Sequence, residues 1–184
     1  MKKTSKKKLI DIGCGNGRDS FFFAKKIFNV TSLDRSDSAI KNNDNYTKKN
    51  KFKNINFIRS DVCEKNILNK KKYDYIYLRF FIHTINYLDQ KKLFKLLNRI
   101  SKKNISLIMF EFRTINDPLM NKGKIISRYE RINYHYRRFI NSNDFIKKFI
   151  KVVDCKLIYI YEGRGISKLK YDNPHLCRLV FKKK

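Results

Sequence analysis

A glycine-rich turn near the N-terminus constrains the fold of this chain more than any other feature. Residues 9–20 read LIDIGCGNGRDS, so three glycines at alternating positions follow a short apolar run and precede an amphipathic one. Without Cβ atoms, a glycine backbone can turn tightly and bring its N–H groups close to a ligand. The segment therefore predicts a buried strand, a ligand-binding turn and a helix, in that order.

The alternation of strand and helix continues along the chain. We expect strands at 8–13, 30–33, 55–59, 73–78, 105–112, 156–161 and 177–182, and helices at 20–27, 36–50, 89–101 and 143–151, the last capped by Ser142. Repeated alternation favours a parallel sheet with helices on both faces. The last two strands have no clear helix between them and favour an antiparallel hairpin at one edge. We therefore predict an α/β fold with a seven-stranded, mostly parallel sheet whose last strand is antiparallel.

Length and composition narrow the class of protein further. The 184 residues suit a single domain over 1–184, with an irregular, polar, substrate-side insertion around 113–140. No apolar run approaches the roughly 18–20 residues of a membrane span, and the basic start leads into only a short strand, so we expect no signal peptide. The four cysteines (Cys14, Cys63, Cys155 and Cys177) lack C-x-x-C spacing. This pattern predicts no metal site and reduced thiols in the cytoplasm.

The net charge has two interpretations. The chain has 44 Lys+Arg against 16 Asp+Glu, a formal charge of +28. Such a surface could bind nucleic acid by releasing condensed counterions. The excess is mostly lysine, however, and it accompanies many Asn, Ile, Tyr and Phe, which share AT-rich codons, so genome composition could supply it as well. The charge alone leaves a nucleic-acid partner open.

The acids that follow the first three strands indicate which ligand the turn binds. The glycine spacing is G-x-G-x-G, and Arg18 stands where the dinucleotide-binding G-x-G-x-x-G pattern needs glycine. Asp11 would repel a pyrophosphate but would suit a ligand with an ammonium and a sulfonium, as in S-adenosylmethionine. Asp34 ends the second strand, placed to accept from ribose hydroxyls. Asp61 follows the third strand, placed to accept from the adenine amino group, with Val62 beside the base.

On these motifs the chain resembles the class I S-adenosylmethionine-dependent methyltransferases from Leu9 to Phe181, with D-I-G-C-G-N-G as the specific element. The resemblance implies a Rossmann-like fold and S-adenosylmethionine as cofactor. The cofactor-binding residues that it implies are Asp11, Gly13, Cys14, Gly15, Gly17, Asp34, Arg35, Asp61 and Val62. Family members usually carry a helix before the first strand, whereas only about eight residues precede it here. We therefore expect either a truncated sequence or a more open site around the methionine portion.

The segments after the fourth and fifth strands would face the methyl acceptor. The N-P-P-Y type of motif is absent, and Leu78-Arg79-Phe80-Phe81 takes its place. Arg79 could bind an anionic substrate, and His83 could act as a general base or simply pack in the core. The residues expected to bind substrate are Arg79, Glu111, Arg113, His135 and Arg138, with Asp117 and Arg137 near them. Arg79, Arg113 and Arg138 together would suit phosphate, phosphonate or carboxylate, although Arg137 and Arg138 could instead pair with surface acids.

Three hypotheses for function follow. The first is methyl transfer to an oxygen or nitrogen of a small, anionic metabolite or glycan precursor. It agrees with the GRDS and EGRG motifs at 17–20 and 162–165, which resemble a bacterial-type subgroup of small methyltransferases. The second is RNA methylation, in which Tyr134, Tyr136 and Phe139 would stack on bases. The third is a non-catalytic subunit that activates a partner, against which the complete set of cofactor-site residues argues.

Overall fold

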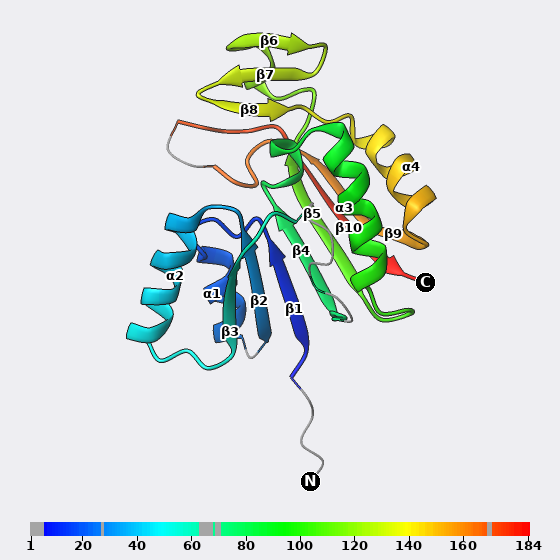
Figure 1. The fold of residues 1–184 in the computed structure, drawn as a ribbon. Coiled ribbons are helices and arrows are strands. Elements are labelled where there is room, and N and C mark those ends of the chain that lie inside the picture. The colour runs from blue at the N-terminus through cyan, green and yellow to red at the C-terminus, as the bar shows by residue number, and fades with distance from the viewer. Residues whose placement is uncertain (1–5, 27, 63–67, 69–70, 169–170) are drawn as a thin grey trace.

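The computed structural model describes residues 6–26, 28–62, 68, 71–168 and 171–184, so Cys63 lies outside the described residues. Its centre is a seven-stranded sheet in the order β3-β2-β1-β4-β5-β10-β9 (Figure 1). The strands are β1 (Lys8–Ile12), β2 (Asn29–Asp34), β3 (Ile55–Arg59), β4 (Tyr75–Arg79), β5 (Leu107–Arg113), β9 (Cys155–Gly163) and β10 (Leu176–Lys183). The first five run parallel, and β10 is antiparallel to both β5 and β9. The predicted fold class, including the hairpin at one edge, is confirmed.

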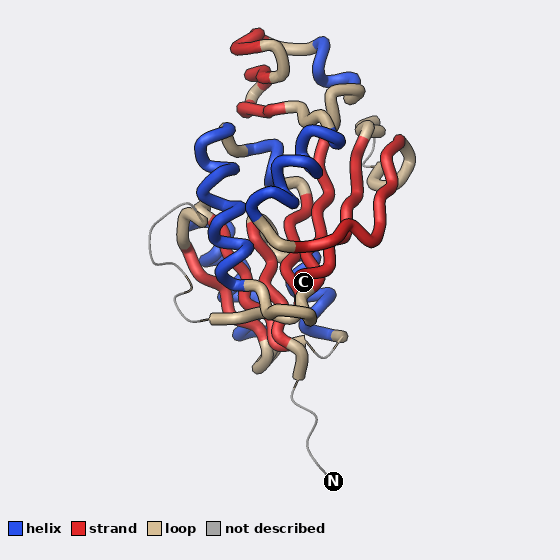
Figure 2. The backbone as a smooth tube through the Cα atoms, turned by 90° about the vertical axis from the view of Figure 1, so that its right-hand side faces the viewer, coloured by secondary structure: helices blue, strands red, loops and turns tan. Residues whose placement is uncertain are grey.

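Among the described residues, four α-helices cover the two faces of this sheet. They are α1 (Arg18–Lys25), α2 (Asp37–Lys49), α3 (Tyr87–Ile100) and α4 (Ser142–Val152). α1 and α2 pack on one face beside β1, β2 and β3, whereas α3 and α4 pack on the other (Figures 1 and 2). Because all five parallel strands point the same way, their carboxyl ends share one edge of the sheet, where α/β proteins bind ligands.

The main core lies under α3 and α4 and is rich in phenylalanine. Phe149 of α4 is fully buried, and its ring centroid lies 4.9 Å from that of Phe94, 5.1 Å from that of Phe110 and 4.6 Å from that of Phe181. These rings come from α3, α4, β5 and β10. One aromatic cluster therefore holds both helices against the part of the sheet that carries the antiparallel strands.

The start of α4 differs from the prediction by one residue. Asn141, not Ser142, caps the helix: its backbone is extended, and its side chain accepts a hydrogen bond of 3.0 Å from the Asp144 N–H. Ser142 is the first helical residue, and it is buried. Both asparagine and serine can cap a helix, so the residue types alone did not separate the two positions.

The insertion is ordered, and the expectation that it is irregular was wrong. It contains a three-stranded antiparallel sheet of β6 (Lys124–Ser127), β7 (Glu130–Asn133) and β8 (His135–Arg138). Both views place this small sheet beyond the carboxyl ends of β4 and β5 (Figures 1 and 2). Its strands have four residues each, too short and too polar for their alternation to stand out in the sequence.

The helices also bear on the membrane expectation. Among the described residues, no helix combines the length and the apolar character that crossing a membrane requires.

The aromatic cluster gives a prediction about stability. Phe149→Ala would leave a cavity among the rings of Phe94, Phe110, Phe145 and Phe181, so we expect the free energy of unfolding to fall by about 3–5 kcal/mol. Phe22→Ala is the matched control, because Phe22 is 55% exposed and its loss should change stability by less than about 0.5 kcal/mol. Urea denaturation of both variants measures the difference. Similar small effects for the two variants would mean that α4 is not held by this cluster.

Candidate functional site

The glycine turn between β1 and α1 forms one wall of the site. Its backbone is tied to the end of β2, because the Gly13 and Cys14 N–H groups both donate to the Leu33 carbonyl, at 2.9 and 3.0 Å. Gly13 has a φ of +77°, and a Cβ there would lie 2.3 Å from Cδ2 of Phe81. Gly15 has a φ of +50° and faces open space. The turn therefore requires glycine for close packing at Gly13 and leaves room for a ligand at Gly15.

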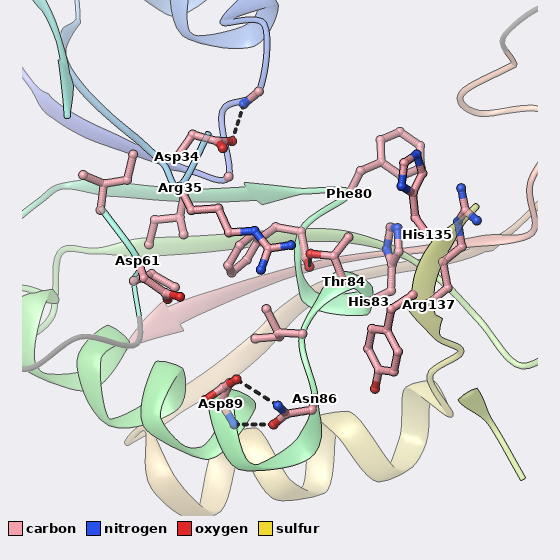
Figure 3. A pocket seen from close by; sticks show the side chains of 18 of the residues that line it. Asp34, Arg35, Asp61, Phe80, His83, Thr84, Asn86, Asp89, His135 and Arg137 are labelled. Atoms are coloured by element: carbon pink, nitrogen blue, oxygen red, sulfur yellow. Dashed lines mark hydrogen bonds between the residues drawn. The ribbon is translucent and has the colours of Figure 1, made fainter. Parts of the chain in front are cut away.

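Asp34, at the end of β2, joins the turn to the next helix. One of its carboxylate oxygens accepts from the Gly15 N–H at 2.8 Å (Figure 3). The other accepts from the Ser36 N–H at 2.9 Å. Each carboxylate oxygen has a second lone pair. The side chain also lines a cavity, so Asp34 can accept from a ligand's hydroxyl groups while it holds the loop.

This larger cavity has a volume of about 1060 Å³ and runs along the carboxyl ends of the strands. Asp34, Arg35 and Asp61 lie at one end, and His83, His135 and Arg137 lie at the other (Figure 3). Asp61 lies two residues beyond the end of β3, and Val62 beside it is buried and also lines the cavity. The structure thus brings the residues predicted for ribose and adenine into one cavity.

A smaller cavity of about 430 Å³ adjoins the larger one. Five residues line both: Gly13, Gly15, Phe80, His83 and Arg137. The other residues of the smaller cavity include Asp11, Cys14, Asp19, Arg79 and Arg113. The two spaces therefore meet where the glycine turn faces the end of β4. Gly17 lines neither cavity; it precedes α1 as its N-cap.

Asp11 is a buried acid in the wall of the smaller cavity. It is 3% exposed, and its carboxylate accepts a 2.5 Å hydrogen bond from the Ser20 hydroxyl. Burial raises the pKa of this carboxyl to about 7, and the nearby charges of Asp19 and Asp34 raise it further, against the lowering effect of Ser20. A cationic ligand in the cavity would favour the ionised form.

Arg79, predicted to be catalytic and to bind substrate, is held by two carboxylates. Its Nε donates to Glu111 at 2.8 Å, and its Nη1 donates to Asp19 at 3.0 Å. Arg178 of β10 also donates to Glu111, and Ser167 donates to the same carboxylate at 3.0 Å. Glu111 is buried by this arrangement. Arg79 and Glu111 therefore form part of an internal ion-pair network beside the smaller cavity.

The other predicted arginines also have partners within the chain. Arg113 donates from Nη1 to both carboxylate oxygens of Asp117, at 3.0 and 2.9 Å, and from Nη2 to Asp172. Arg138 donates to the Ile85 carbonyl at 3.1 Å and to the Gln90 side chain, and it lines neither of the two cavities. The three arginines expected to form one anion site are thus spread over separate internal contacts.

His83 lies in a single turn of 3-10 helix (Ile82–Thr84) after β4 and lines both cavities. Burial lowers its pKa to about 3, with further lowering by Arg113, Arg137 and Arg138. Its Nδ1 accepts a long, 3.4 Å hydrogen bond from the Arg113 N–H. A neutral imidazole that accepts at Nδ1 carries its proton at Nε2, so here His83 is a donor and only a weak base.

The insertion contributes His135 and Arg137 to the larger cavity. Arg138, which the sequence predicts to bind substrate, lines neither cavity. Of the three aromatic residues expected to stack on RNA bases, Tyr134 and Tyr136 line the larger cavity and Phe139 does not. Tyr134 is 95% exposed, but Phe139 is buried, and the Tyr136 hydroxyl donates to Glu130.

Comparisons with known proteins agree with this geometry. Residues 3–147 match the family model described as "Methyltransferase domain". The chain is 28% identical over 178 residues to "Ubiquinone biosynthesis O-methyltransferase" of Rickettsia typhi, a match that spans 91% of this chain and 70% of that protein. Across the seven curated relatives of this name, the match spans between 28% and 73% of their lengths.

Solved structures share the fold. An S-adenosylmethionine-dependent methyltransferase from Methanosarcina mazei superimposes with a TM-score of 0.78 at 13% identity, over 98% of this chain and 93% of that one. The glycopeptide N-methyltransferase MtfA, in complex with S-adenosylhomocysteine, gives 0.72 at 10% identity, over 99% and 85%. With the family match over most of its length, the chain belongs to the class I S-adenosylmethionine-dependent methyltransferases.

Proposed function

We propose that this chain transfers the methyl group of S-adenosylmethionine to an oxygen atom of a small acceptor molecule. The observation that carries the proposal is the junction of the two cavities. The larger, about 1060 Å³, has the residues suited to the adenosine portion at one end and His83, His135 and Arg137 at the other, whereas the smaller, about 430 Å³, is lined by Asp11 and the glycine turn, which suit the methionine portion. The name shared by the curated relatives, which specifies an O-methyltransferase, supports oxygen over nitrogen.

Each cofactor contact would use a group already in place. Asp34 would accept from the ribose hydroxyls and Asp61 from the adenine amino group, while Val62 would pack against the base and Arg35 would border it. The Gly13–Gly17 turn, including Cys14, would border the methionine portion, and Asp11 would attract its ammonium group. When bound, S-adenosylmethionine supplies a methyl group on a positively charged sulfur.

The chain's own contribution to the reaction would be mainly positioning. Gly13, Phe80 and His83 line both cavities, so an acceptor held at the His135 end of the larger one would face the transferable methyl group at their junction. Holding two reactants in line and excluding water can supply much of the rate of such a transfer. The low basicity of His83 fits this arrangement, because its imidazole can donate a hydrogen bond more readily than it can take up a proton.

A labelled-methyl assay tests the proposal. Incubation with radiolabelled S-adenosylmethionine and separate pools of phenols, amines and RNA should transfer label to a phenolic oxygen. Mass spectrometry of the product then locates the new methyl group. Label in the amine pool would contradict the choice of oxygen, and label in RNA would contradict the small-molecule acceptor.

Asp34 gives a prediction about cofactor binding. Asp34→Ala removes the acceptor of the Gly15 and Ser36 N–H groups together with the proposed ribose contact. We expect the affinity for S-adenosylhomocysteine to fall by about 1–3 kcal/mol, as measured by calorimetry. Asp37→Ala is the matched control, because Asp37 is an exposed acid nearby on α2 and should bind the ligand like the wild type. Equal affinities for all three proteins would refute the ribose role.

Removing the charge of Asp11 should stabilise the fold at neutral pH and weaken ligand binding. Its folded-state pKa of about 7 exceeds the ordinary value of 3.8. Between these values the unfolded chain releases a proton that the folded chain keeps, so stability is full below about pH 4 and is lost as the pH rises to about 7. Asp11→Asn mimics the protonated form. It should match the wild type near pH 4 and exceed its free energy of unfolding by ~1–3 kcal/mol at pH 8.

The same variant should bind S-adenosylhomocysteine more weakly, because the ligand's ammonium group would lose its carboxylate. Urea denaturation at the two pH values and calorimetry at pH 8 check both parts. Asp37→Asn, at an exposed position, is the control that should show neither change. A wild-type stability that does not fall between these pH values would rule out the buried-acid interpretation.

A further inference from the structure

Arg137 differs from the other buried arginines at the two cavities. Arg79 and Arg113 each pair with two carboxylates. Arg137 is partly buried and lines both cavities, yet among the described residues its guanidinium makes no ion pair. Its one side-chain hydrogen bond there runs from Nη1 to the Asn133 carbonyl, at 3.0 Å. Most of its donors are therefore available at the junction of the cavities.

The surroundings of Arg137 make this unpaired charge costly. Burial lowers its pKa, and Arg113 lowers it further, while Asp172 and Asp117 offset part of the effect from a distance. A cation that is taken partly out of water without a paired anion loses hydration that nothing replaces. An anion bound at the junction would restore that lost stabilisation, so the site favours a negatively charged group.

His83, the histidine beside Arg137, adds a hydrogen-bond donor to the junction of the cavities and no acceptor. His83 lines the same two cavities, and its Nδ1 already accepts from the Arg113 N–H. The neutral ring then presents an N–H at Nε2. A guanidinium fork beside a neutral N–H donor is complementary to a planar carboxylate, which can accept two parallel hydrogen bonds from arginine.

We propose that Arg137, with His83 beside it, binds a carboxylate group of the methyl acceptor. The inference rests on the proposed function and adds to it the chemical class of the acceptor, a small carboxylic acid. The position of Arg137 favours the acceptor over the cofactor as the source of this carboxylate. Arg137 reaches the junction from β8, beyond the ends of β4 and β5. The residues suited to the cofactor instead belong to the segments at the ends of β1, β2 and β3.

The test compares a charged ligand with a neutral one of the same shape. The protein is saturated with S-adenosylhomocysteine, and benzoate or benzamide is then titrated and followed by nuclear magnetic resonance shifts. We expect benzoate to bind the wild type about tenfold more tightly than benzamide, and Arg137→Gln to remove that preference. Arg137→Lys keeps the charge but loses the fork, so it should retain part of the preference.

Arg128→Gln is the matched control. Arg128 lies in the same insertion and is exposed, with its guanidinium 5.0 Å from the ring centroid of Tyr129, and it lines neither cavity. This variant loses the same charge and should keep the full preference for benzoate. A wild type that binds benzoate no better than benzamide, or not at all, would overturn the proposal, as would a preference that persists in Arg137→Gln.

A second experiment distinguishes a carboxylate of the acceptor from the carboxylate of the cofactor. It also distinguishes failure of this proposal from failure of the proposed function. S-adenosylhomocysteine carries a methionine-type carboxylate, and 5′-methylthioadenosine lacks it. If Arg137→Gln weakens binding of the first but not of the second, Arg137 holds the cofactor and the acceptor proposal fails. Equal binding by wild type and variant supports it. Failure of the wild type to bind either nucleoside would instead count against the proposed function.

Discussion

The hydrogen bond from the Gly15 N–H to the Asp34 carboxylate, 2.8 Å long, is the interaction on which the site depends. It fixes the glycine turn after β1 against the end of β2, and the bonds from Gly13 and Cys14 to the Leu33 carbonyl reinforce it. Within the turn the Gly17 N–H donates to the Cys14 carbonyl at 2.9 Å, but the N–H groups of Gly13, Cys14 and Gly15 find their acceptors outside it, so the turn needs this external anchor. Once the turn is held, Gly15 faces the larger cavity and Asp11 is enclosed behind it. The same carboxylate that shapes the turn thus also lines the larger cavity.

The sheet and the positions of Asp34 and Asp61 at its edge could be predicted from the sequence because both depend on local patterns. The strands are short apolar runs, the turn is a glycine motif, and Asp34 and Asp61 sit at or just after strand ends, so their positions follow from the order of the elements. The residues predicted to bind the acceptor depend instead on contacts between distant segments. Glu111 is neutralised by Arg79 from β4 and by Arg178 from β10, which lies 67 positions after Glu111 in the chain. Local sequence does not show which arginine pairs with which acid. The prediction that three arginines share one anion site therefore did not include these ion pairs.

Arg137 and Arg138 show why the arginine that lines the cavities was not identified from the sequence. In a loop, two neighbouring arginines can point the same way, and the segment was expected to be irregular. In β8 they alternate, because successive side chains in a strand point to opposite faces. Arg138 therefore turns towards Gln90 at the start of α3, while Arg137 turns towards the cavities. Strand geometry, once known, assigns the two residues different environments, and the residue type alone could not.

Acidic residues are more frequent at the two cavities than the net charge of the whole chain suggests. Asp34, Asp61 and Asp89 line the larger cavity and Asp11, Asp19 and Asp172 the smaller, so six of the 16 acidic residues of a chain with 44 basic ones border these two spaces. Acids that are scarce elsewhere are concentrated where a cationic cofactor and buried guanidinium groups need counter-charges. A lysine excess that comes from genome composition would leave such a distribution unchanged, because it adds charge mainly to exposed positions. The unpaired guanidinium of Arg137 stands out because it lies among acids that neutralise its neighbours. The local balance of charge, more than the formal +28, therefore indicates what the site binds.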